Sequence, residues 1–114
     1  MKILKPKILF EHNFHDANIL SFGFENDNKL IFTLIIEYYD FENNQSTFKL
    51  EYLDVQDYNI KISNHGQYQP EIENHIIKKE GKIYFQTFQL HGGGLISLKF
   101  KKVIIMQTIS SAKN

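Results

Sequence analysis

Apolar and polar residues alternate along the stretch Leu95-Ile96-Ser97-Leu98-Lys99-Phe100-Lys101. From Ile96 onward every second residue is apolar, and the residues between them are polar. Residues 47–52 repeat the pattern. Because successive side chains of a strand point to opposite faces, the alternation predicts strands with one buried and one solvated face.

Residues 29–39 are richer in apolar side chains and predict a central strand covered on both faces. β-Branched and aromatic residues favour a strand over a helix there. Short polar clusters at residues 26–28, 42–45 and 80–81 predict hairpin turns. Residues 64–70 lack periodicity and are expected to form the central connection.

The two halves of the chain resemble each other. The pattern Leu50-x-Tyr52-x-x-Val55 recurs as Leu98-x-Phe100-x-x-Val103. Two similar units, residues 15–62 and 72–109, are therefore expected, with chance similarity between β-rich segments as the alternative. The break in period before each valine predicts a β-bulge.

These patterns predict one all-β domain spanning residues 1–114. We expect about six antiparallel strands, arranged as two three-stranded meanders that pack face to face as a small sandwich or flattened barrel.

The composition excludes several classes of function. All 13 basic residues are lysine, 13 acidic residues balance them, and the chain has neither cysteine nor tryptophan. The absence of cysteine excludes disulfides, thiolate metal sites and a cysteine nucleophile. A neutral chain without arginine is a poor match to nucleic-acid binding. The sequence has no apolar run typical of an export signal or a membrane span, so we expect a cytoplasmic protein.

Histidines supply the densest group of possible metal ligands, at His12-x-x-His15-Asp16. A zinc or iron site requires His12, His15 or His91 to approach within ~5 Å of one another. The alternative, histidines on the surface or in turns, is favoured because a strand points His12 and His15 to opposite faces. We assign no metal and no cofactor on this basis.

Catalytic motifs are incomplete. The segment His91-Gly92-Gly93-Gly94 is similar to the oxyanion loop of some esterases, but the chain has no Gly-x-Ser-x-Gly nucleophile elbow. The three glycines predict a hairpin loop instead. We therefore do not expect an enzyme.

Aromatic and acidic residues are interleaved in two segments, a composition typical of a surface that binds a basic protein partner. The alternative is that these rings cover the ends of the core. A small-ligand or carbohydrate-binding surface, with the rings as stacking platforms, is the second functional hypothesis. Six lysines of the second unit give that half the opposite charge. The expected partner-binding residues are Tyr38, Tyr39, Asp40, Phe41, Glu42, Asp54, Asp57 and Tyr58.

The segment containing His15, Asp16 and Ile19, followed by the alternating strands, resembles small bacterial all-β immunity proteins of polymorphic-toxin and contact-dependent inhibition systems. The resemblance implies a cytoplasmic, non-enzymatic protein that binds one cognate toxin domain and blocks its active site.

Overall fold

The computed structural model describes residues 2–25, 28–39, 44–62 and 70–111. These residues form nine strands and one short helix. In chain order the elements are β1 (Lys2–Leu4), α1 (Ile8–Glu11), β2 (Asn18–Glu25), β3 (Asn28–Tyr39), β4 (Asn44–Leu53), β5 (Asp57–Ile62), β6 (Ile72–Glu80), β7 (Ile83–Leu90), β8 (Gly94–Phe100) and β9 (Lys102–Ser111).

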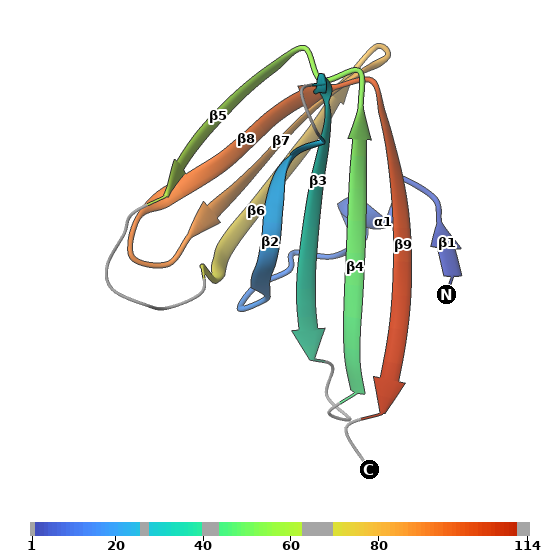
Figure 1. Cartoon of the computed structure of the whole chain (residues 1–114), viewed down its shortest axis with the longest axis vertical. Coiled ribbons are helices and arrows are strands. Elements are labelled where there is room, and N and C mark those ends of the chain that lie inside the picture. The colour runs from blue at the N-terminus through green and yellow to red at the C-terminus, as the bar shows by residue number, and fades with distance from the viewer. Residues whose placement is uncertain (1, 26–27, 40–43, 63–69, 112–114) are drawn as a thin grey trace.

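The strands form two antiparallel sheets (Figure 1). The first sheet has the order β1-β9-β4-β3-β2, and the second has the order β5-β8-β7-β6. The all-β class and the two meanders β2-β3-β4 and β6-β7-β8 are thus confirmed. The prediction of six strands is wrong, because β1, β5 and β9 complete the sheets.

The additional strands escaped prediction for separate reasons. β1 has three residues, too few for a period to be visible. β5 is an edge strand whose side chains are mostly exposed, so its sequence does not need to alternate between apolar and polar residues. Only Lys101 separates β8 from β9, and the apolar residues from Val103 onward look like a continuation of β8.

The predicted bulges at residues 53–55 and 101–103 are instead the points where the chain crosses between the sheets. Asp54 has a positive φ of 57°, and the strand that follows it belongs to the second sheet. Both crossings lie at the same end of the molecule, the upper end in Figure 1. The Gln56 N–H donates to the Lys99 carbonyl at 2.7 Å, and this hydrogen bond holds the two crossings together. We call this end the corner.

The same order of elements therefore occurs twice. β2-β3-β4 is followed by β5, which pairs with β8 of the other sheet, and β6-β7-β8 is followed by β9, which pairs with β4. β2 to β5 span residues 18–62 and β6 to β9 span residues 72–111, beside the units expected at residues 15–62 and 72–109, which stay a prediction. A duplication of sequence as its origin stays a prediction.

One hydrophobic core lies between the sheets and draws on both. Phe32, Leu34 and Ile36 of β3 are buried, and Tyr52 of β4 meets Phe100 of β8 edge-on, with ring centroids 4.7 Å apart. Thr33 and Ile35, whose side chains point to the other face of β3, are half-buried. The expectation that β3 is covered on both faces is therefore wrong, because only its inner face packs against another layer.

The two sheets form an open sandwich and not a closed barrel. Among the described residues, β2 and the segment before β6 are joined by the isolated bridge Asn18–Glu71, while β1 and β5 are the outer edges of their sheets. The helix α1, which the sequence did not predict, buries Leu9 in the core.

Candidate functional site

The structure places the expected partner-binding residues at two separate ends of the first sheet. Tyr38 and Tyr39 end β3 and pair with Ser46 and Gln45 at the beginning of β4. Asp54 lies after the other end of β4, at the corner. Ten residues of β4 separate the ends, roughly 30 Å for an extended strand. The eight residues are therefore not one continuous surface.

The expected residues at the end of β3, Tyr38 to Glu42, form the lower group, and the structure describes few of their side chains. The Tyr38 side chain is half-buried and packs against the core, as the alternative interpretation expected. Tyr39 is described only as a backbone position of β3, and Asp40, Phe41 and Glu42 lie outside the described residues. Their proposed contact role stays a prediction.

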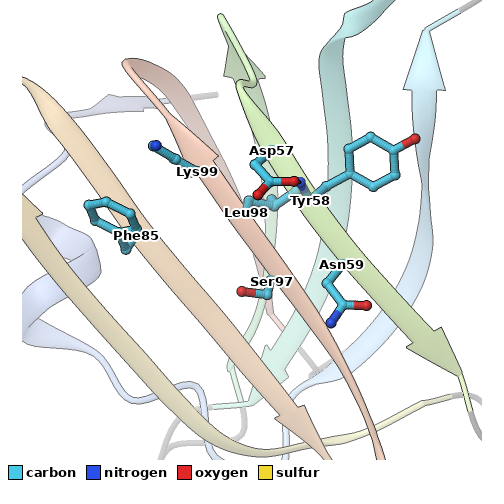
Figure 2. Close-up of a pocket in the computed structure, with 7 residues that line it drawn as sticks. All are labelled: Asp57, Tyr58, Asn59, Phe85, Ser97, Leu98 and Lys99. Atoms are coloured by element: carbon cyan, nitrogen blue, oxygen red, sulfur yellow. The ribbon is translucent and has the colours of Figure 1, made fainter.

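The upper group lies on β5 and the crossing before it. Oδ1 of Asp57 accepts the Tyr58 backbone N–H at 2.8 Å. The Tyr58 side chain is 47% exposed, and its ring meets Phe24 of β2 edge-on at 4.8 Å. Figure 2 shows a shallow pocket here, to which Asp57 and Lys99 contribute from neighbouring strands. Phe85 lines the same pocket from β7.

Lysines gather around this end of the second sheet. Five of them are exposed and Lys99 is half-buried. Among the described residues only one of the six, Lys78, is in an ion pair, with Glu80 at 3.2 Å. We call this group the lysine corner; its members are Lys78, Lys79, Lys82, Lys99, Lys101 and Lys102.

Two features give the lysine corner its shape. Nζ of Lys78 and Nζ of Lys99 lie over the Phe85 ring, 5.2 and 5.6 Å from its centroid. The other four lysines line a hollow together with Asp54 and Tyr84. The aromatic rings of this end are therefore neighbours of ammonium groups, which favour the ring face.

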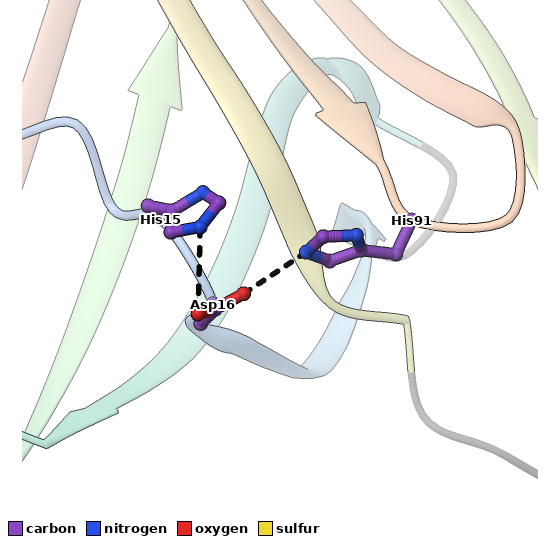
Figure 3. Close-up of side chains that lie close together, drawn as sticks. All are labelled: His15, Asp16 and His91. Atoms are coloured by element: carbon purple, nitrogen blue, oxygen red, sulfur yellow. Dashed lines mark hydrogen bonds and ion pairs between the residues drawn. The ribbon is translucent and has the colours of Figure 1, made fainter.

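A second group of polar side chains meets at the opposite end of the second sheet (Figure 3). His15 and Asp16 lie in the turn before β2, and His91 lies in the loop between β7 and β8. Nε2 of His91 is 3.0 Å from Oδ1 of Asp16, and Nε2 of His15 is 3.4 Å from Oδ2. One ligand atom from each residue lies within 4.8 Å of the others.

The start of β6 holds this group together. The Asp16 N–H donates to the Ile72 carbonyl at 2.7 Å, and the His91 N–H donates to the Glu71 carbonyl at 2.9 Å. The Glu73 carbonyl accepts a hydrogen bond from Nδ1 of His15 at 2.7 Å. Oε2 of the same glutamate lies 3.5 Å from Nδ1 of His91.

The other described histidines lie elsewhere. The His12 ring packs near Phe14, with centroids 5.8 Å apart. The His75 ring stacks on Phe88 at 4.9 Å, and its Nδ1 donates to the His12 carbonyl at 3.1 Å. Burial lowers the pKa of His75, which the hydrogen bond to His12 opposes in part.

The sequence identified His12, His15 and His91 as the histidines that a metal site would have to bring together, beside Asp16. The structure brings His15, Asp16 and His91 together, and His12 is not in this group. His91 was expected in a hairpin loop, which is confirmed: Gly92 and Gly93 have positive φ in the turn between β7 and β8, and so does Gly94 at the start of β8. No local pattern connects this loop with the turn at His15. The loop and the turn lie close together because residues 71–73 form hydrogen bonds with both of them.

Compared with known proteins, the chain matches no family model, no curated protein and no solved structure. In the part of the chain that the structure describes, no helix has the length and apolar character needed to cross a membrane.

Proposed function

We propose that this domain is a non-catalytic protein-binding module and that it binds its partner through the lysine corner together with Asp54, Asp57 and Tyr58. The supporting observation is the distribution of charge. A chain of zero net charge places six lysines around the corner where the two sheets meet, and five of them have no ion pair among the described residues. A positive surface of this kind attracts an acidic partner.

The clustering itself is unfavourable in the free protein. Like charges on neighbouring positions of a sheet repel one another, and cation–π contacts with Phe85 and Tyr84 offset only part of that repulsion. Carboxylates of a partner placed between the lysines relieve it. Tyr58 and Tyr84 supply apolar contact area beside the charges.

A protein partner fits this surface better than a nucleic acid does. Two ammonium groups lie over the Phe85 ring, which leaves it unsuited to stacking on a base. Asp54 and Asp57 lie among the lysines and can pair with basic side chains of a protein partner, which a nucleic acid does not offer. The chain also has no arginine for bidentate contacts to phosphates or guanines.

Within this class we propose an immunity protein that neutralises a cognate toxin domain by covering its active site. The support is the resemblance carried by His15, Asp16 and Ile19. The position of the lysines changes the expected chemistry of the partner. The sequence alone suggested acidic groups facing a basic toxin, whereas the corner favours a toxin surface rich in carboxylates.

The second hypothesis, a carbohydrate-binding sandwich, requires exposed coplanar rings on one sheet face. At the corner, Tyr58 meets Phe24 at an interplanar angle of 61°, and Tyr84 stacks at 7° on Phe100, which is fully buried. These ring pairs do not favour that hypothesis.

Calorimetric titration with a cognate toxin domain tests the proposal. We expect saturable binding that weakens at least about tenfold in the double variant Lys82→Glu/Lys101→Glu, because the charge reversal repels an acidic partner. The matched control is Lys49→Glu/Lys61→Glu, which reverses two exposed lysines away from the corner. Equal losses in both variants would exclude the corner as the binding surface.

A further inference from the structure

The group formed by His15, Asp16 and His91 has the composition of a transition-metal site. Two imidazoles and one carboxylate are ligands that borderline divalent ions such as zinc or ferrous iron accept, often with further positions open to solvent. The three side chains are 54%, 63% and 41% exposed, so a bound ion is reachable from solvent.

The distances agree with coordination. Ligands about 2.0–2.1 Å from a tetrahedral ion lie about 3.3 Å from each other. Oδ1 of Asp16 lies 3.0 Å from Nε2 of His91, and Oδ2 of Asp16 lies 3.4 Å from Nε2 of His15. Because the three ligand atoms already lie within 4.8 Å of one another, small rotations of exposed side chains bring all three to an ion.

Both imidazoles are oriented by their second nitrogen. A carbonyl oxygen can only accept, so Nδ1 of His15 carries the proton that it donates to the Glu73 carbonyl, and in the neutral ring Nε2 keeps its lone pair. Nδ1 of His91 lies 3.5 Å from Oε2 of Glu73, and it can donate to this carboxylate when an ion replaces the proton that Nε2 shares with Asp16. Metal-binding histidines commonly donate their other N–H to a carbonyl or carboxylate in this way. One residue orients both rings.

A separate feature of the backbone places Glu73 there. The pairing of β6 with β7 shifts register between Ile72 and Asn74, so Glu73 is an extra residue with no partner on β7. Such bulges re-aim side chains and release backbone groups from the ladder. Here the released carbonyl meets His15 and the side chain meets His91.

The backbone of the turn supports the same conclusion. Asp16 has φ of 65°, a conformation that non-glycine residues rarely adopt, and the hydrogen bond from its N–H to Ile72 holds it there. Phe14 and Ala17, on either side of His15 and Asp16, are buried and anchor the turn in the core. The backbone of Asp16 is thus fixed where it places the carboxylate between the two rings.

We propose that His15, Asp16 and His91 bind one divalent transition-metal ion, with Glu73 as the residue that positions both imidazoles. With Glu73, the site has two carboxylates to balance the charge of the ion. The site lies away from the corner, at the other end of the second sheet, and the proposal is independent of the proposed partner surface.

Calorimetric titration of the EDTA-treated, dialysed protein with zinc chloride tests this. We expect one zinc ion per chain. His15→Ala and His91→Ala should each lower the affinity by more than about 100-fold, and Glu73→Gln by about tenfold. His12→Ala, the matched control for the loss of one histidine, should leave the affinity unchanged. Unfolding curves in EDTA verify that each variant is folded.

Imidazole NMR of the unmodified chain gives a readout that needs no variant. Zinc should shift the Nε2 resonances of His15 and His91 and leave those of His12 in place. Absence of saturable binding, binding that survives the loss of His15 or His91, or shifts at other histidines only would each overturn the proposal.

Discussion

Nε2 of His91 lies 3.0 Å from Oδ1 of Asp16, although 75 positions separate the two residues in the chain. The contact joins the turn before β2 to the loop between β7 and β8. Both segments are tied to the start of β6 by backbone hydrogen bonds. The turn is therefore fixed by its backbone, and its conformation can be tested separately from its side chains.

The positive φ of Asp16 predicts a difference between two substitutions that both remove the carboxylate. Glycine adopts φ near 65° without steric cost, whereas alanine does not. Asp16→Gly should therefore retain more stability than Asp16→Ala, by on the order of 1 kcal/mol in the free energy of unfolding. Urea denaturation of both variants measures this. Equal stability would mean that the turn relaxes when its carboxylate is removed.

Gly81 and Gly23 offer the same test without any change in charge. Gly81, in the turn between β6 and β7, has φ of 62°, and nothing lies within 4 Å of the position of an added Cβ. Gly81→Ala should thus cost about 1 kcal/mol through backbone strain alone. Gly23, in β2, has equal space and no positive φ. Gly23→Ala should leave the thermal midpoint unchanged or raise it. A similar loss at both sites would contradict this account.

Tyr52 is fully buried, and its hydroxyl has the Gln86 side chain as a polar neighbour but no partner in hydrogen-bonding geometry among the described residues. Tyr52→Phe should therefore leave the free energy of unfolding unchanged or raise it by up to about 1 kcal/mol. Tyr58→Phe, at an exposed ring, is the matched control. A clear loss of stability in Tyr52→Phe, with none in the control, would show that the hydroxyl is satisfied in solution.

Alkaline unfolding tests the same residue by its ionisation. Burial raises the pKa of Tyr52 well above 10.0, and the neighbouring Gln86 opposes part of that rise. The unfolded chain releases this proton near pH 10 while the folded chain retains it. Stability due to Tyr52 is thus present below pH 10 and lost as the pH rises above it. Tyr52→Phe should lose less stability over that range in urea titrations.

His75 predicts the opposite dependence at acid pH. Burial lowers its pKa from 6.5, and Gln86 lies 2.8 Å from its Nε2 as a donor to the neutral ring. Below pH 6.5 the unfolded chain binds a proton that the folded chain resists, so stability falls with falling pH. His75→Gln should reduce this acid loss, and His12→Gln should not. An identical acid loss in His75→Gln and the unmodified chain would contradict the assignment.

The sequence predicted the strands in which buried and exposed residues alternate. It missed β1, β5 and β9, which are recognised only from their pairing with other strands. The alternation through Leu98 and Phe100 identified β8, and the glycines after His91 identified the turn before it. The break in period at Asp54 was visible too. It was interpreted as a bulge, because a residue that leaves one sheet for another has the same local pattern as one that bends a strand.

The candidate sites depended on the fold in the same way. Asp57 and Tyr58 were chosen for their composition and lie at the corner, but the lysines around them come from β6, β8, β9 and the turn before β7. Their meeting follows from the crossings between the sheets. The bulge at Glu73 is likewise a matter of register between two strands, which no single segment of sequence specifies.

The central proposal is that the lysine corner binds and neutralises a cognate toxin domain, and an inhibition assay with such a domain tests it most directly. The account predicts that one equivalent of the domain abolishes the toxin's activity. Lys82→Glu/Lys101→Glu should require at least about ten times more protein, and Lys49→Glu/Lys61→Glu no more than the unmodified domain. Full toxin activity in the presence of excess unmodified domain, or equal inhibition by both double variants, would contradict it.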